Sequence, residues 1–157
     1  MKPKVYLETT IVSYLTAVPS RDLVTAAHQQ ITRDWWETRR TDFDLFVSQA
    51  VTQEASAGDP DAAARRLTVL EQLALVGVTD EAVRFAAELI ENIPLPEQAA
   101  VDALHIAIAV LNGMHYLLTW NCRHIANAVL RARITAICQT RGYEAPVICT
   151  PEELLEE

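Results

Sequence analysis

The stretch KVYLETTIVSYLTAVP, residues 4–19, predicts a strand that is followed directly by a helix. Residues 4–8 form a short apolar run with β-branched and aromatic members, which is typical of a buried strand. Thr9 and Thr10 can cap a helix over residues 11–17, and Pro19 ends it. Glu8 therefore stands between two segments that should be buried, where an ionised carboxylate is costly unless a cation or a hydrogen-bond donor meets it.

The same alternation of strand and helix continues along the chain. Further strands are expected over residues 43–48, 75–79, 115–119 and 146–150, the last at a sheet edge. Helices are expected over residues 22–40, 49–57, 60–74, 81–92, 95–111 and about 121–141, with Asp80 as the cap of the fourth. Strands separated by helices predict an α/β fold, a three-layer α/β/α sandwich with a central parallel sheet. The 157 residues suit a single domain, residues 1–157.

Three carboxylates lie beside apolar sequence on separate segments: Glu8, Glu54 and Asp102. Asp102 is the only carboxylate beyond the first turn of the helix expected over residues 95–111, and that helix is apolar nearly all round. Each acid has an ordinary explanation by itself, namely a helix start for Glu8, solvation for Glu54 and a buried arginine partner for Asp102. Because ligands of parallel sheets bind outside the carboxyl ends of the strands, we predict that the three share one acidic pocket.

Carboxylate and carbonyl oxygens are ligands that suit Mg²⁺ or Mn²⁺ rather than zinc. Asn121 follows the strand over residues 115–119, and its side chain can either serve as a neutral ligand or cap the next helix. Thr9 and Thr119 add hydroxyls at the ends of two strands. His105 lies one turn after Asp102 and can hydrogen-bond it. A packed, neutral core histidine is favoured over a metal ligand at this position. A hard cation at such a site can activate water and neutralise charge on a phosphodiester.

The charge of the chain is uneven, although its net value of −8 argues against a protein that coats nucleic acid non-specifically. No acidic residue occurs between Asp102 and Glu144. That interval instead holds Arg123, Arg131, Arg133 and Arg141. These arginines are either the solvated face of helices or a positive wall for a phosphate backbone. Trp120 is either a buried anchor or a platform on which an unpaired base stacks.

The cysteines and the N-terminal segment bear on where the protein works. Three cysteines without a CxxC pair make a disulfide framework improbable and favour a reducing compartment. The first residues contain only a short apolar run interrupted by Glu8, which fits neither a signal peptide nor a membrane span. We therefore expect a cytoplasmic protein with no membrane partner.

Four segments, VYLETTIVSYL, VSQAVTQEAS, AVDALHIAIAV and YLLTWNCRHIAN, resemble the PIN-domain family of metal-dependent ribonucleases, which includes the VapC-type toxins. The resemblance covers essentially the whole chain in the expected order. It implies a PIN-like sandwich and a quartet of Glu8, Glu54, Asp102 and Asn121 around Mg²⁺ or Mn²⁺. It also implies a metal-dependent endoribonuclease that is the toxin of a type II toxin–antitoxin module, with single-strand-type RNA as substrate and a small antitoxin as partner.

An alternative function follows from two departures from the family. The family usually has Asp at the position of Glu8 and an acid at or near Asn121. These departures favour a catalytically weak or inactive PIN-like module that binds RNA or a protein partner. A phospho-receiver domain would need a late lysine near its acids, but the only lysines are Lys2 and Lys4. Trp35 and Trp36 are expected to supply core and a partner surface, the latter in a homodimer.

Overall fold

A computed structural model describes residues 1–93, 95–96 and 99–156. Its sheet has five parallel strands, β1 (Lys4–Leu7), β2 (Asp44–Ser48), β3 (Ala74–Val76), β4 (Tyr116–Leu118) and β5 (Val147–Cys149), in the order β3-β2-β1-β4-β5. The α-helices are α1 (Thr9–Thr16), α2 (Leu23–Arg39), α3 (Gln49–Ala55), α4 (Pro60–Leu70), α5 (Asp80–Asn92), α6 (Ala100–Leu111) and α7 (Ala128–Thr140). Two 3₁₀ helices, η1 (Arg40–Asp42) and η3 (Pro151–Leu154), complete the described elements.

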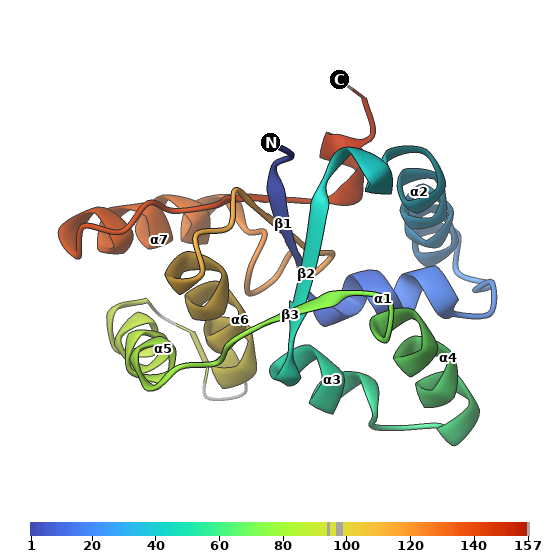
Figure 1. Cartoon of the computed structure of the whole chain (residues 1–157), viewed down its shortest axis with the longest axis horizontal. Helices are drawn as coiled ribbons and strands as arrows, with labels where there is room; N and C mark the ends of the chain where they lie inside the picture. Colours follow the sequence, from blue (N-terminus) through green and yellow to red (C-terminus); the bar gives the residue numbers. More distant parts are fainter. Residues whose placement is uncertain (94, 97–98, 157) are drawn as a thin grey trace.

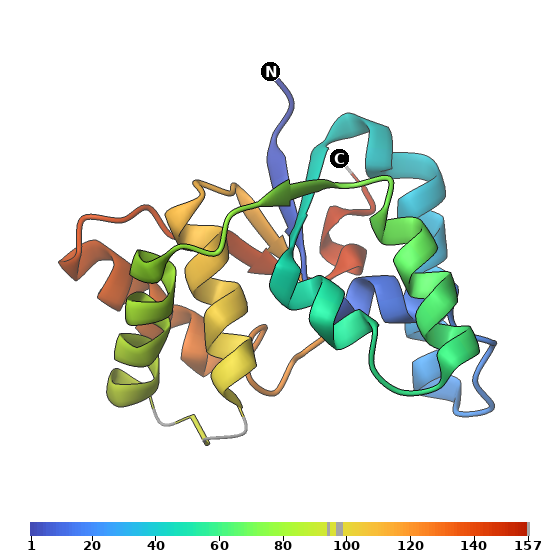
Figure 2. The same ribbon diagram turned by 60° about the horizontal axis from the view of Figure 1, so that its bottom comes forward.

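The path of the chain explains the layers. The chain steps outward from β1 to β2 and β3, then returns to β4 and β5 on the other side of β1. Right-handed crossovers in opposite directions place their helices on opposite faces of a sheet. Figures 1 and 2 accordingly show α1, α2 and α4 on one side of the strands and α5, α6 and α7 on the other. The predicted α/β/α sandwich with a parallel sheet is confirmed.

The core is built around β1 and α6. The side chains of Val5, Tyr6 and Leu7 are fully buried, as expected for a strand in the middle of a parallel sheet covered on both faces. On α6, Ala103 and every residue from 105 to 110 are buried, so the helix is covered nearly all round as predicted. Across the described residues, no helix combines the length and the apolar character needed to cross a membrane.

Several predicted boundaries differ from the structure. The helix α1 already begins at Thr9 with Glu8 as its N-cap, so the predicted capping by Thr9 and Thr10 is wrong. The helix α5 is capped by the Thr79 hydroxyl, which accepts from the Ala82 N–H, and Asp80 is its first residue, so the predicted capping by Asp80 is wrong. Gly113, with φ of +67°, follows α6 where a stop was predicted, because glycine adopts this left-handed conformation without strain.

Other elements are shorter than predicted, among them α4, which ends at Leu70 rather than at residue 74. The third strand covers Ala74–Val76 rather than residues 75–79. The helix predicted over residues 95–111 is observed over Ala100–Leu111, and residues 97–98 of the prediction lie outside the described residues. The last helix, α7, begins at Ala128, because residues 121–126 form a turn in which the Asn121 carbonyl accepts from the N–H groups of Ile125 and Ala126.

Candidate metal centre

The site lies where the carboxyl ends of β1 and β4 meet. The Glu8 N–H donates to the Leu118 carbonyl at 3.0 Å, so the residue after β1 is held against the end of β4. The strand order reverses between these two strands, since β2 follows β1 on one side and β4 lies on the other. Such a switch point is where ligands of open parallel sheets bind. Glu8 and Thr119 therefore occupy the predicted edge of the sheet.

Glu8 is a buried carboxylate. Its side chain is only 3% exposed, and its Oε1 accepts from the hydroxyls of Thr10 at 2.5 Å and Thr119 at 2.6 Å. Burial raises the pKa of Glu8, although the nearby imidazole of His105 and the two hydroxyls oppose this change. The protein therefore holds an acid at a place where a positive charge would stabilise its ionised form.

Glu54 reaches the same place from α3, which follows directly after β2. Its Oε1 accepts from the Thr9 hydroxyl at 2.6 Å and lies 2.5 Å from His105 Nε2. Burial raises the pKa of Glu54, but the hydrogen bonds from His105 and Thr9 outweigh it, and the pKa is lowered overall. With 37% of its side chain exposed, Glu54 is the ionised, solvent-facing acid of the pair.

His105 links these acids to the core. Its ring is fully buried, with Nδ1 2.7 Å from the Tyr6 hydroxyl, which in turn lies 2.8 Å from the Ser48 hydroxyl. Burial raises the pKa of Tyr6, so its O–H remains protonated and able to donate. Every polar atom of the His105 ring therefore has a partner inside the protein.

The ligand atoms of Glu8, Glu54 and His105 all lie within 4.8 Å of one another, and the described residues contain no other cluster of three such groups at this spacing. The predicted convergence of acids thus holds for Glu8 and Glu54. His105 is a packed core histidine as predicted, but it bonds Glu54 rather than Asp102, so that part of the prediction is wrong. Its position three residues after Asp102 on α6 places both on one helix face, a signal visible in the sequence.

Asp102 lies outside the three-residue cluster. Its Oδ2 is 3.0 Å from Nδ1 of His124, a partner that the sequence did not suggest, and both side chains are partly buried. A carboxylate engaged by an imidazole is already stabilised, which is why Asp102 does not join the two glutamates. Asp102 is thus not among the side chains whose ligand atoms lie within 4.8 Å of one another, and its place in one shared acidic pocket stays a prediction.

The side chain of Asn121 caps the turn that follows it, which is one of the two alternatives considered for this residue. Its Oδ1 accepts from the His124 N–H at 3.0 Å, and its own N–H donates to the Thr119 hydroxyl at 2.9 Å. Thr119 in turn donates to Glu8. A continuous chain of hydrogen bonds thus runs from Asp102 through His124, Asn121 and Thr119 to Glu8, and it holds Asp102 and Asn121 at the border of the centre.

Trp120 is an anchor inside the fold. It is 7% exposed, its indole N–H donates to the Thr32 hydroxyl at 2.7 Å, and its ring stacks on His28 with centroids 4.0 Å apart. This packing ties the segment after β4 to α2. The alternative in which Trp120 stacks on an unpaired base does not fit a ring face that His28 already covers.

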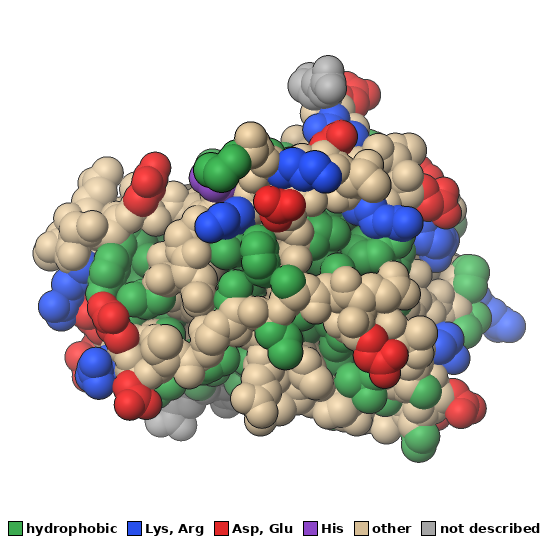
Figure 3. Space-filling view, in the orientation of Figure 1, with side chains coloured by type: hydrophobic (Ala, Val, Ile, Leu, Met, Phe, Trp, Pro, Cys, Tyr) green, Lys and Arg blue, Asp and Glu red, His purple; other side chains and the backbone are tan. Residues whose placement is uncertain are grey.

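The arginines of the acid-free interval have different environments. Arg123 and Arg133 are exposed, whereas Arg131 donates to the Ile148 carbonyl of β5 and Arg141 pairs with Glu88 at 2.7 Å. On the face shown in Figure 3, basic and acidic side chains are interspersed rather than gathered by sign. Arg123 and Arg133 are therefore the two that remain candidates for contact with a phosphate backbone.

The strand order, the layers and the acid after β1 define a VapC-type PIN-domain fold, which confirms the resemblance seen in the sequence. One similar structure is that of VapBC2 from Rickettsia felis bound to a DNA fragment from their promoter. The match covers 94% of this chain and 98% of that chain, with 13% sequence identity and a TM-score of 0.58. The chain is also similar over 76% of its length to 92% of Mycobacterium tuberculosis VapC20, a Sarcin–Ricin loop cleaving toxin, with 15% identity and a TM-score of 0.61. No family model and no curated protein matches the sequence. At such low identity the similarity establishes the fold.

Proposed function

We propose that the protein is a metal-dependent endoribonuclease and the toxin of a type II toxin–antitoxin module. The observation that carries the proposal is the pairing of buried Glu8 with Glu54 at the switch point of a VapC-type fold. The similarity to VapC20, which cleaves the Sarcin–Ricin loop, supports RNA as the substrate.

The residues present fit a divalent cation. Glu8 is 97% buried and lacks a cationic side chain of lysine or arginine among its described hydrogen-bond partners, so an ion would offset the cost of its negative charge. Glu8 and Glu54 would hold Mg²⁺ or Mn²⁺, with Asp102 and Asn121 at the border. When bound, such an ion activates water and neutralises charge that develops on the phosphodiester.

The chain's own residues prepare this centre. Thr10 and Thr119 orient the Glu8 carboxylate, while Thr9 and His105 orient that of Glu54. Because these donors come from α1, from the residue after β4 and from α6, the two carboxylates are held in place before a ligand arrives. Exposed Arg123 and Arg133 would contact the phosphate backbone of the RNA.

The proposed partners follow from the same function. The structure from Rickettsia felis contains VapBC2 bound to promoter DNA, and by analogy we propose a small antitoxin as partner of this chain. We further propose that the protein acts in the cytoplasm and as a homodimer. Trp35 is fully buried within one copy, so of the two tryptophans only the partly buried Trp36 remains available to such an interface.

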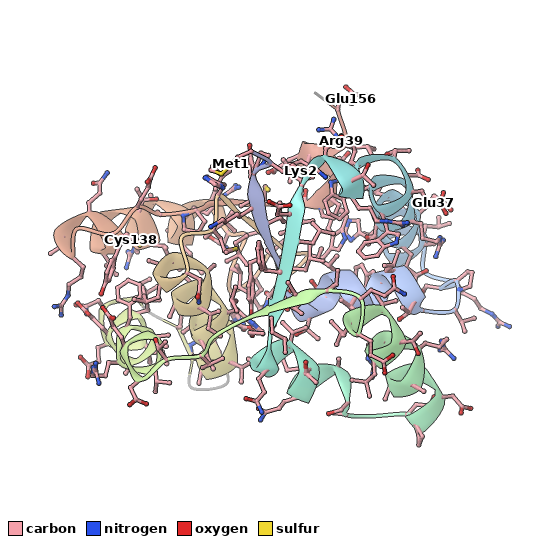
Figure 4. All side chains as sticks on the ribbon, viewed as in Figure 1. Met1, Lys2, Glu37, Arg39, Cys138 and Glu156 are labelled. Atoms are coloured by element: carbon pink, nitrogen blue, oxygen red, sulfur yellow. The ribbon has the colours of Figure 1, made fainter. Side chains whose placement is uncertain are left out.

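The function is tested by incubating the purified protein with a mixed RNA pool, with Mg²⁺, with Mn²⁺ and with a chelator. Wild type should cleave only with a metal, and Glu54→Gln should reduce the rate by about 10- to 100-fold, because one charged ligand is lost. Glu37→Gln is the matched control, since Glu37 is exposed on α2 (Figure 4) and should cleave like wild type.

Absence of cleavage with both metals, from a folded protein, would overturn the nuclease proposal. The result would favour the non-catalytic PIN-like module instead, which binds RNA or a protein partner. Equal cleavage by wild type and Glu54→Gln would show that the activity does not belong to this centre.

A further inference from the structure

We propose that His105 is itself a metal ligand, so that the centre is a mixed nitrogen and oxygen site with a preference for Mn²⁺ over Mg²⁺. This inference rests on the proposed function, whose ion it specifies. The carboxylate ligands alone would not distinguish these two ions strongly, because both accept oxygen ligands.

The first support is the spacing of the three side chains. Their ligand atoms lie within 4.8 Å of one another, and two ligands on one ion at about 2.1 Å are at most about 4.2 Å apart. Adjustments of roughly half an ångström therefore bring the three atoms onto one ion. His105 reaches this position from α6, whereas Glu54 is carried by α3.

The second support is the state of the carboxylate oxygens. In Glu8 one oxygen, Oε1, accepts both hydroxyl bonds, and in Glu54 one oxygen likewise accepts from both Thr9 and His105. The Thr10 backbone also contacts Glu8. Since Glu8 is 97% buried and these donors are neutral hydroxyl and amide groups, a cation beside its carboxylate would stabilise the ionised form.

The third support is the environment of the His105 ring. Metal-binding histidines almost always donate their other ring N–H to a polar group that fixes the tautomer. Here Nδ1–H can donate to the Tyr6 oxygen while the Tyr6 O–H donates to Ser48, which leaves the lone pair of Nε2 free. In the metal-free protein Nε2–H donates to the ionised Glu54 at 2.5 Å, and the chain of hydroxyls then runs in the other direction. A bound ion would take the place of this proton, and the ring would then carry its proton on Nδ1.

The donor set then selects among ions. Imidazole nitrogen suits transition metals, whereas Mg²⁺ prefers oxygen ligands and water in octahedral geometry. Mn²⁺ accepts two carboxylates and one imidazole together. Since a nitrogen ligand favours only the transition metal, we expect Mn²⁺ to bind at least about tenfold more tightly than Mg²⁺.

The direct test is pulsed electron paramagnetic resonance of the protein loaded with Mn²⁺. Wild type should show magnetic coupling of a histidine ¹⁴N to the bound ion, and His105→Gln should lose it. His124→Asn is the matched control, because His124 is the other histidine near the site, and this variant should keep the coupling. Bound Mn²⁺ without nitrogen coupling, or loss of the coupling in His124→Asn, would overturn the inference even if His105→Gln does not fold.

Calorimetric titration with each metal supplies the second measurement. Tyr6→Phe removes the hydroxyl that orients His105 and should weaken Mn²⁺ binding by about 10- to 100-fold with the fold intact. An unchanged Mn²⁺ affinity in this variant, or equal wild-type affinities for Mn²⁺ and Mg²⁺, would contradict the proposal. RNA cleavage measured in parallel distinguishes the nuclease proposal from the proposed ligand role of His105. Cleavage without nitrogen coupling refutes only the ligand role. Nitrogen coupling without cleavage refutes only the nuclease.

Discussion

Glu8→Gln should reduce metal-dependent RNA cleavage by about 100-fold or more and at the same time raise the melting temperature of the metal-free protein. The loss of cleavage follows because a metal ligand is worth several kcal/mol in a site of this kind, and about 2.7 kcal/mol corresponds to 100-fold. The gain in stability follows because a neutral amide has no buried charge to desolvate. Opposite changes in activity and stability distinguish a functional residue from one that merely supports the fold.

The pH dependence of stability gives this prediction a second measurement. Burial raises the pKa of Glu8 in the folded state above its unfolded value of about 4.3. The folded protein therefore binds this proton more tightly, and the resulting stabilisation is present at low pH and is lost as the pH rises through the folded pKa. From pH 7 to pH 5, metal-free wild type should gain stability relative to Glu8→Gln, as measured by urea denaturation.

The control for both measurements is Glu37→Gln, which makes the same chemical change at an exposed position. It should follow wild type in cleavage, melting temperature and pH dependence. If Glu8→Gln lowers the stability of the metal-free protein, then the Glu8 carboxylate is an ordinary structural acceptor for Thr10 and Thr119. That outcome would remove the argument for a cation site.

The sequence predicts those parts of the fold in which local pattern and burial agree. The apolar run of β1 and most apolar residues of α6 are buried, and both elements were predicted, β1 with nearly the observed bounds and α6 with the observed end at Leu111. The strand β3 was misplaced because it is an edge strand in which Leu75 is 66% exposed, so its apolar pattern is weak. Capping of α1 by Thr9 and Thr10 was wrongly predicted, because their hydroxyls donate to the acidic pair instead of serving the helix end.

The candidate site was less predictable, because it depends on which side chains meet across the sheet. Glu8 and Glu54 were found because each follows a strand whose carboxyl end faces the same edge. The partner of Asp102 was missed because His124 lies in a turn that sequence pattern assigns to a helix. No local sequence pattern predicts that the His124 imidazole contacts Asp102 on α6. None predicts that His105 bonds Glu54 rather than Asp102.

Trp35→Ala should destabilise the protein by about 3–5 kcal/mol, whereas Trp36→Ala should cost only about 1 kcal/mol. Trp35 is fully buried on α2 and packs near Phe43 with ring centroids 6.0 Å apart, so its removal leaves a large cavity. Trp36 is only partly buried, with the Arg40 guanidinium 5.1 Å from its ring centre. Urea denaturation of both variants measures the difference.

The same pair of variants tests the proposed homodimer, because neighbouring tryptophans on one helix differ mainly in which surface they face. If Trp36 lies in an interface between two copies, the cost of Trp36→Ala should grow with protein concentration, since association stabilises only the folded dimer. Trp35→Ala should show its full cost at every concentration. Equal costs for the two variants in dilute protein would mean that Trp36 belongs to the core of a single copy, and the proposed interface would then have to lie elsewhere.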